Sequence, residues 1–348
     1  MRSDHAAVIG AGFGGLAAAV RLRAKGYRVT VVESTSQPGG RASVFRQDGF
    51  TFDAGPTVIT APYLINELFE LLGEKPGNFF QLEAIDPFYR IVFHDGSQFD
   101  YVGDEKRLLQ NIAKLSPEDV QGYKRLAQLA ERIFDVGYTQ LSDQPFDHLT
   151  DMLKVIPQMV RLGNHRSVYS VVSKYIKDER LRRALSFEPL LVGGNPHSVT
   201  SIYLLIHWLE RKWGVHFAQG GTTSLINAFV RLLKKHGVSF VFDSKVQQIE
   251  VSERSQVQGV QLATGQSIPC DLVVSNADPI LVYSQMVPQK FRRKNTDRRV
   301  LNMKSSMGLF VIYFGTDRTY PELAHHTILL SKRYKGLLKE IFDKKILP

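Results

Sequence analysis

The sequence predicts an α/β fold in which a Rossmann-type dinucleotide-binding domain carries an inserted second domain, mixed α+β and largely helical. Three observations predict this fold. A glycine-rich turn stands between two apolar runs near the N-terminus, residues from about 80 to 235 are poor in glycine and rich in helix patterns, and strand patterns return after them. A length of 348 residues also favours two domains.

Composition narrows the class of protein. The chain is 43% apolar and 22% charged, which is typical of folded globular proteins. Its single cysteine, Cys270, excludes a disulfide framework and an all-cysteine metal site. The net charge of +10 favours acidic partners such as nucleic acid or anionic lipid. No uncharged run approaches the roughly 20 residues that span a bilayer, so any membrane contact is expected from one side.

The N-terminal residues follow the order strand, glycine turn, helix, strand. Residues 6–9 predict a short buried strand, residues 16–25 a helix that ends at Gly26, and residues 27–33 a second strand. This arrangement is a βαβ unit of about the usual length.

The turn of this unit has GxGxxG spacing. Gly10 permits the tight turn, Gly12 lets a diphosphate approach the backbone, and Gly15 lets the helix pack closely on the strand. Glu33 ends the second strand, where a carboxylate accepts hydrogen bonds from ribose hydroxyls and disfavours a 2′-phosphate. A plain βαβ turn is the alternative. We predict a dinucleotide site formed by Glu33 and the turn residues Gly10, Ala11, Gly12, Phe13, Gly14 and Gly15.

Two further segments favour FAD over NAD. Gly40 and Arg41 follow the acidic residue, and a guanidinium beside a permissive backbone suits a second contact with a diphosphate. Gly55, Pro56 and Thr57 belong to the stretch Asp-Ala-Gly-Pro-Thr, which predicts a rigid turn suited to holding a loop against a flat ring. An ordinary turn is the alternative for this second segment.

Together these motifs resemble the FAD-dependent amine oxidase and phytoene desaturase superfamily. Longer segments between about residues 6 and 340 are similar to the bacterial and fungal type of phytoene desaturase, among them FTFDAGPTVIT, SFEPLLVGGNPHSVTSIYLLIHWLER and LAHHTILLS. The resemblance implies FAD as cofactor and a backbone contact between Val246 and adenine. It implies successive dehydrogenations of phytoene toward lycopene, in carotenoid biosynthesis.

The resemblance also implies domain limits. We expect a discontinuous FAD-binding domain at residues 1–80 and 235–285, and a substrate and membrane-associated domain at residues 81–234 and 286–348. The family's further C-terminal block, with a second glycine-rich stretch, is expected to be absent, leaving both domains incomplete. The alternatives to a phytoene desaturase are another carotenoid flavoprotein, such as a thirty-carbon desaturase or a carotenoid oxidase, and a truncated non-catalytic remnant.

Basic residues gather in two places. Residues 151–183 hold eight Lys or Arg against three Asp or Glu, interleaved with apolar residues, which predicts a face that lies on anionic lipid. A solvated helical hairpin is the alternative. Residues 290–299 hold six bases and one acid, but their poor aromatic and glycine interleaving argues against nucleic acid. The expected partners are a polyene and a membrane surface, with the protein peripheral on the cytoplasmic side.

The chemistry of dehydrogenation assigns the hydride to the cofactor, because side chains accept hydride poorly. Asp151, His207 and Glu210 lie in plausible segments for moving a proton, but surface or structural roles are favoured and the catalytic residues remain unassigned. His325 and His326 are expected to point to opposite faces of a strand, so no metal site is predicted.

Overall fold

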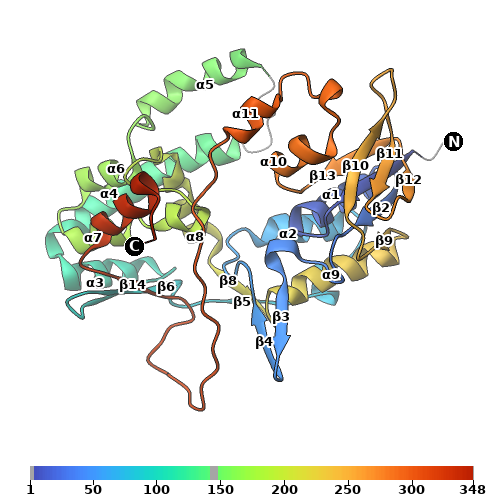
Figure 1. Cartoon of the computed structure of the whole chain (residues 1–348). Helices are drawn as coiled ribbons and strands as arrows, with labels where there is room; N and C mark the ends of the chain where they lie inside the picture. Colours follow the sequence, from blue (N-terminus) through green and yellow to red (C-terminus); the bar gives the residue numbers. More distant parts are fainter. Residues whose placement is uncertain (1–3, 142–147, 348) are drawn as a thin grey trace. The chain divides into compact units, whose positions relative to one another are not determined.

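The computed structural model describes residues 4–141 and 148–347, and it divides into two units (Figure 1). The first unit comprises Met1–Glu83 with His216–Ser305, and the second comprises Ala84–Val215 with Ser306–Pro348. The limits expected from the sequence, at residues 80, 234 and 285, lie near the first of these boundaries and about 20 residues from each of the other two. At the second boundary the reason is helix α9 (Thr222–Lys235), which packs on the sheet of the first unit.

The centre of the first unit is a four-stranded parallel sheet. Its strands, in spatial order, are β13 (Leu272–Ser275), β1 (His5–Ile9), β2 (Arg28–Val32) and β9 (Ser239–Val241). Ala7 of the central strand pairs with Val273 on one side and Thr30 on the other. All five residues of β1 are buried, as expected for a strand covered on both faces.

Alternate residues of β1 face different layers, because side chains alternate across a strand. Ala6 and Val8 face a helical layer and join a core with Leu16 and Phe229. The helices of this layer are α1 (Phe13–Ala24), α2 (Pro62–Glu70) and α9.

The opposite face is covered by an antiparallel sheet of β10 (Val246–Val251), β11 (Val257–Leu262) and β12 (Ser267–Pro269). Ala7 and Ile9 pack there against Val246, Ile249 and Val260. The remaining elements of this part of the chain are the hairpin strands β3 (Val44–Gln47) and β4 (Phe50–Asp53), the paired strands β5 (Leu82–Ala84) and β8 (His216–Ala218), and helices α10 (Pro279–Leu281) and α11 (Asp297–Leu301).

The second unit is mainly helical. It holds a three-stranded sheet in the order β14 (Thr327–Leu330), β6 (Tyr89–Phe93) and β7 (Gln98–Tyr101), in which β14 is parallel and β7 antiparallel to β6. Its helices are α3 (Glu105–Leu115), α4 (Val120–Phe134), α5 (Leu149–Arg161), α6 (Val168–Tyr175), α7 (Glu179–Ala184), α8 (Leu204–Trp213) and α12 (Tyr334–Lys339). The predicted fold class is confirmed. Within the described ranges, no helix is both long and apolar enough to cross a bilayer.

Candidate functional site

The glycine turn lies at the carboxyl end of β1, where ligands bind in open parallel sheets. Gly10 has φ +97°, a conformation that side chains rarely adopt, and its N–H donates to the carbonyl of Val32 at 2.8 Å. Gly12 is the N-cap of α1, and no side chain caps the helix there. The first N–H groups of α1 are therefore available to an anion.

The other turn glycines differ in what an added Cβ would meet. At Gly15 it would lie 1.9 Å from the carbonyl oxygen of Gly10, so this glycine is required for the turn to close on the helix. At Gly12 the nearest atom would be the carbonyl oxygen of Gly39 at 3.6 Å, an ordinary contact. At Gly14 it would lie 2.6 Å from Nδ2 of Asn276, an exposed side chain. Gly12 therefore leaves space above the backbone that the fold does not fill.

Glu33 ties the end of β2 to the turn. Its side chain is buried, and Oε2 accepts a hydrogen bond from the Ala11 N–H at 2.8 Å. Oε1 accepts from the hydroxyls of Ser34 and Thr35 at 3.0 and 3.1 Å. Burial by itself would raise the pKa of Glu33, but these hydrogen bonds more than offset it and the pKa lies below its usual value. The result is an ionised acceptor that already takes hydroxyl donors.

The first of the two later motifs packs against the glycine turn, and the second packs against the first. Gly39 donates its N–H to the Ala11 carbonyl at 2.9 Å, and Gly40 adopts φ +54° as Arg41 enters a short helical turn with its side chain exposed. A Cβ added at Gly55 would lie 2.2 Å from the Arg41 carbonyl oxygen. The predicted residues 10–15, 33, 40, 41 and 55–57 therefore belong to one contiguous cluster of turns in the first unit.

The residues just before Val246 contact this cluster through the backbone. Ser244, two residues earlier, donates its N–H to the Glu33 carbonyl at 2.9 Å. The side chain of Val246 is buried in the core between the two sheets, where it packs near Val32.

Sequence reasoning missed the residues that hold the Asp-Ala-Gly-Pro-Thr turn. The Thr222 N–H donates to Oδ2 of Asp53 at 3.1 Å, and the Thr222 hydroxyl donates to the Pro56 carbonyl at 2.6 Å. A Cβ added at Gly221 would lie 2.5 Å from Asp53 Oδ2. The available signal was the glycine pair directly before the helix pattern of α9.

Two of the residues considered for proton movement lie deep in the second unit. His207 and Glu210 on α8 are buried. Nδ1 of His207 lies 3.0 Å from the Tyr101 hydroxyl and 3.3 Å from Oε1 of Glu188, and Nε2 lies 3.1 Å from the Tyr123 hydroxyl. We call His207, Glu210, Glu188 and the tyrosines that bond to them the buried polar cluster.

The acids of the buried polar cluster have no cationic partner within hydrogen-bond distance among the described residues. The Tyr89 hydroxyl donates to Oε1 of Glu210 at 2.6 Å, while Oε2 is buried without a hydrogen-bond partner. Burial raises the pKa of Glu188 to about 8, and burial together with Glu188 raises that of Glu210. Burial and the charge of Arg211 lower the pKa of His207 to about 3. These groups are neutral near pH 7 and link β6, β7, α4 and α8, which fits the favoured structural role.

The other candidates also have structural explanations. Oδ2 of Asp151 accepts from the His148 N–H at 3.3 Å, at the start of α5. His325 and His326 precede β14, and their ring centroids are 4.6 Å apart, so the expectation that a strand separates them was wrong. Among the residues that the structure describes, no group of three or more His, Cys, Asp or Glu is arranged to hold a metal.

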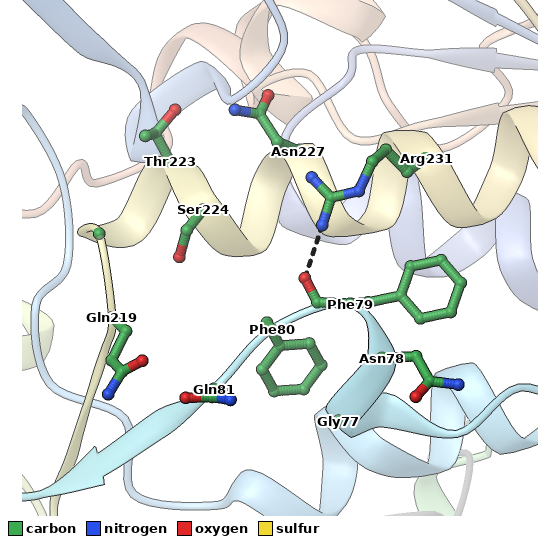
Figure 2. Close-up of a pocket in the computed structure, with 11 residues that line it drawn as sticks. Gly77, Asn78, Phe79, Phe80, Gln81, Gln219, Thr223, Ser224, Asn227 and Arg231 are labelled. Carbon is green, nitrogen blue, oxygen red and sulfur yellow. Dashed lines mark hydrogen bonds between the residues drawn. The ribbon is translucent and has the colours of Figure 1, made fainter.

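Two cavities adjoin opposite faces of α9. The larger, of about 480 Å³, lies between residues 77–81 and α9, and polar side chains line it together with Phe79 and Phe80 (Figure 2). Figure 2 shows Arg231 donating to the Phe79 carbonyl at its rim. None of the predicted site residues lines it. The smaller cavity, of about 330 Å³, is apolar and includes Phe13 and Pro56 in its wall.

The chain is similar to a known family of flavoproteins. The flavin-containing amine oxidoreductases match residues 13–344. The chain is 43% identical to the lycopene-forming phytoene desaturase of Pantoea ananas, over 97% of this chain and 68% of that protein. It is 42% identical to the neurosporene-forming phytoene desaturase of Cereibacter sphaeroides, over 98% of this chain and 66% of that protein. The chain thus spans about two thirds of the length of these relatives.

Solved structures share the fold at low identity. An oxidoreductase from Methanosarcina mazei gives a TM-score of 0.59 at 17% identity, covering 81% of this chain and 61% of that one. Cyclohexylamine oxidase from Brevibacterium oxydans gives a TM-score of 0.52 at 21% identity, covering 82% of this chain and 60% of that one.

Proposed function

The chain belongs to the flavin-containing amine oxidoreductases and, within them, to the phytoene desaturases, and we propose that it performs FAD-dependent desaturation of phytoene toward lycopene in carotenoid biosynthesis. The observation that carries this proposal is the 43% identity to a phytoene desaturase over 97% of the chain. The cluster of turns in the first unit supports it, because its residues fit the parts of FAD.

Separate residues of the cluster suit separate parts of FAD. The uncapped N-terminus of α1 and the open space at Gly12 suit the diphosphate, with Arg41 as a second contact. Oε1 of Glu33 suits ribose hydroxyls, which would take the place of the Ser34 and Thr35 hydroxyls that it accepts from in this structure. The backbone at Val246 would lie against adenine, and residues 55–57 would lie along the flavin ring. When bound, FAD supplies the two-electron acceptor for the hydrogens that leave a saturated carbon–carbon bond.

The relatives differ in the product that they form. One relative at 43% identity is lycopene-forming, and another at 42% is neurosporene-forming. The 4,4'-diapophytoene desaturase of Staphylococcus haemolyticus is 29% identical, which favours phytoene over the thirty-carbon substrate. The non-catalytic alternative predicts a protein that purifies without flavin.

A peripheral contact with the cytoplasmic face of the membrane completes the proposal. Among the side chains of α5 that the structure describes, three exposed apolar ones are spaced three and four residues apart, with exposed fractions of 56%, 46% and 52% at Leu153, Ile156 and Val160. Lys154 and Arg161 add positive charge beside them. An amphipathic helix of this kind lies in the interface, and anionic lipid of the cytoplasmic leaflet attracts its basic residues.

Expression in a bacterium that accumulates phytoene tests the function. We expect coloured polyenes in extracts of cells that make the protein, and none in cells that make the Gly12→Val variant, whose side chain obstructs the diphosphate. A purified protein that carries FAD but leaves phytoene unchanged would reject the substrate. A colourless purified protein would favour the non-catalytic remnant.

A further inference from the structure

The apolar cavity of about 330 Å³ in the first unit has no ligand assigned to it so far, although Phe13 and Pro56 in its wall belong to the proposed FAD site. Its walls come from α1, residues 56–61, α2 and α9. The face of α9 that lines it carries Thr222, Leu225 and Phe229, whose spacing of three and four residues puts them on one side of the helix.

The chemistry of the walls selects a hydrocarbon. Of the lining residues only Thr222 has a polar side chain, and its hydroxyl already donates to the Pro56 carbonyl at 2.6 Å. The other side chains are aliphatic or aromatic, among them Ala17, Ile65 and Phe229. A ligand that needs hydrogen bonds would lose those made with water and find no side-chain replacement. An isoprenoid chain, which has no polar group, loses nothing on entry and buries apolar surface.

The position of the cavity connects it to the proposed cofactor site. Phe13 directly follows Gly12 at the start of α1, and Pro56 directly follows Gly55. Thr222 also donates its N–H to Asp53, which anchors the Asp-Ala-Gly-Pro-Thr turn. A hydrocarbon in this cavity would therefore lie beside the turns to which FAD is assigned.

We propose that this cavity binds one end of the isoprenoid substrate and so helps to determine which bonds reach the flavin. The inference rests on the proposed function. The volume lies at the lower limit of small-molecule sites, about 300–1,000 Å³, so the cavity receives a terminal part of a long polyene and not the whole molecule.

Filling the cavity tests the proposal. Ala17→Leu adds bulk inside it, whereas Ala18→Leu makes the same change at the next position of α1, which does not line it. We expect Ala17→Leu in the FAD-loaded protein to raise the KM for phytoene by about tenfold, the usual effect of a few methylene groups in an apolar pocket. Ala18→Leu should leave the KM unchanged.

A measurement without turnover separates this inference from the proposed function. Squalane is a saturated isoprenoid, so it has no double bond with which a new one could be conjugated. It should raise the thermal unfolding temperature of the wild-type and Ala18→Leu proteins but not that of Ala17→Leu. Ala61→Leu, which fills the cavity from the loop before α2, replaces Ala17→Leu if that variant does not fold.

The outcomes are distinct. An Ala17→Leu or Ala61→Leu protein that keeps its FAD, its KM for phytoene and its squalane response would overturn the inference and leave the function standing. A lower thermal unfolding temperature of either variant, with an unchanged KM for phytoene, would mean that the chain itself fills the cavity. That result would also overturn the inference. A wild-type protein that responds to squalane and carries FAD but does not desaturate phytoene would reject the function alone.

Discussion

Gly12→Ala separates the role of Gly12 in the fold from its role in binding a diphosphate. The nearest atom to an added Cβ is the Gly39 carbonyl oxygen at 3.6 Å, an ordinary van der Waals distance. The torsions of Gly12, φ −78° and ψ 174°, lie in the extended region that alanine adopts without strain. The ligand-free fold therefore accommodates the methyl group.

Two opposing effects set the change in stability. Alanine restricts the unfolded chain more than glycine does, which stabilises the protein by about 0.4–1 kcal/mol. Gly12 is also the N-cap of α1, a position where alanine is less favourable than glycine by up to about 1 kcal/mol. We expect the unfolding free energy of the ligand-free protein to change by less than about 0.5 kcal/mol.

Binding of FAD should respond much more strongly. The methyl group occupies the space through which the diphosphate approaches the N–H groups of α1. The loss of one charge-assisted hydrogen bond costs about 1.5–3 kcal/mol, which raises the Kd for FAD by about 10- to 150-fold. Fluorescence titration of the apoprotein with FAD measures the affinity, and urea unfolding measures the stability.

Two further glycines serve as controls. Gly15→Ala should destabilise the ligand-free protein by at least the 1–3 kcal/mol or so of overpacking, because its Cβ would lie 1.9 Å from a backbone oxygen. Gly77→Ala meets no atom within 4 Å and should change neither quantity much. A Gly12→Ala protein with wild-type stability and wild-type affinity for FAD would refute the placement of the diphosphate over Gly12.

Three other predictions follow from the packing and the charges. Gly55→Ala puts a Cβ 2.2 Å from the Arg41 carbonyl oxygen and should push the two turns apart. We expect the FAD content of the purified protein to fall by about tenfold. An unchanged flavin-to-protein absorbance ratio would contradict the assignment of these turns to the FAD site. The folded protein holds protons on Glu188 and Glu210 that the unfolded chain loses at an ordinary carboxyl pKa, so the unfolding free energy should fall by up to about 1.4 kcal/mol per pH unit for each group as the pH rises from that value toward 8. Urea unfolding followed by the two tryptophans, both on α8, should show this slope, and the Glu188→Gln, Glu210→Gln protein should lack it; an equal slope in both proteins would show that other groups cause it. The exposed apolar residues of α5 are Leu153, Ile156 and Val160, and replacing them by serine should weaken sedimentation of the protein with anionic vesicles by about tenfold or more. The thermal unfolding temperature should not fall. Unchanged sedimentation would exclude α5 as the membrane contact.

Local sequence was sufficient for the glycine turn. Gly10, Gly12 and Gly15 carry distinct requirements within six consecutive residues, and the structure bears out the tight turn at Gly10 and the close packing at Gly15. The βαβ unit could equally be predicted from the sequence, because β1, α1 and β2 follow one another directly and each has its own periodicity of apolar residues.

Contacts between distant residues could not be predicted from the sequence. Thr222 and Asp53 are 169 residues apart, and neither shows by its neighbours that it will bond to the other. The buried polar cluster joins Tyr89 to Glu210 across 121 residues and Tyr101 to His207 across 106. In each case the partner is chosen by tertiary packing, which one sequence without its fold does not specify. The same limit explains the placement of α9, whose apolar face meets the parallel sheet of the first unit.

The account depends on a flavin, held by the amino-terminal turns, that takes hydrogen from a polyene hydrocarbon. Anaerobic mixing of the FAD-loaded protein with phytoene in anionic vesicles tests this most directly, with the visible absorption of flavin and polyene recorded together. We predict that absorption of oxidised flavin falls as new conjugated double bonds form in equal amount. Flavin that stays oxidised in a protein shown to bind both FAD and phytoene would contradict the account.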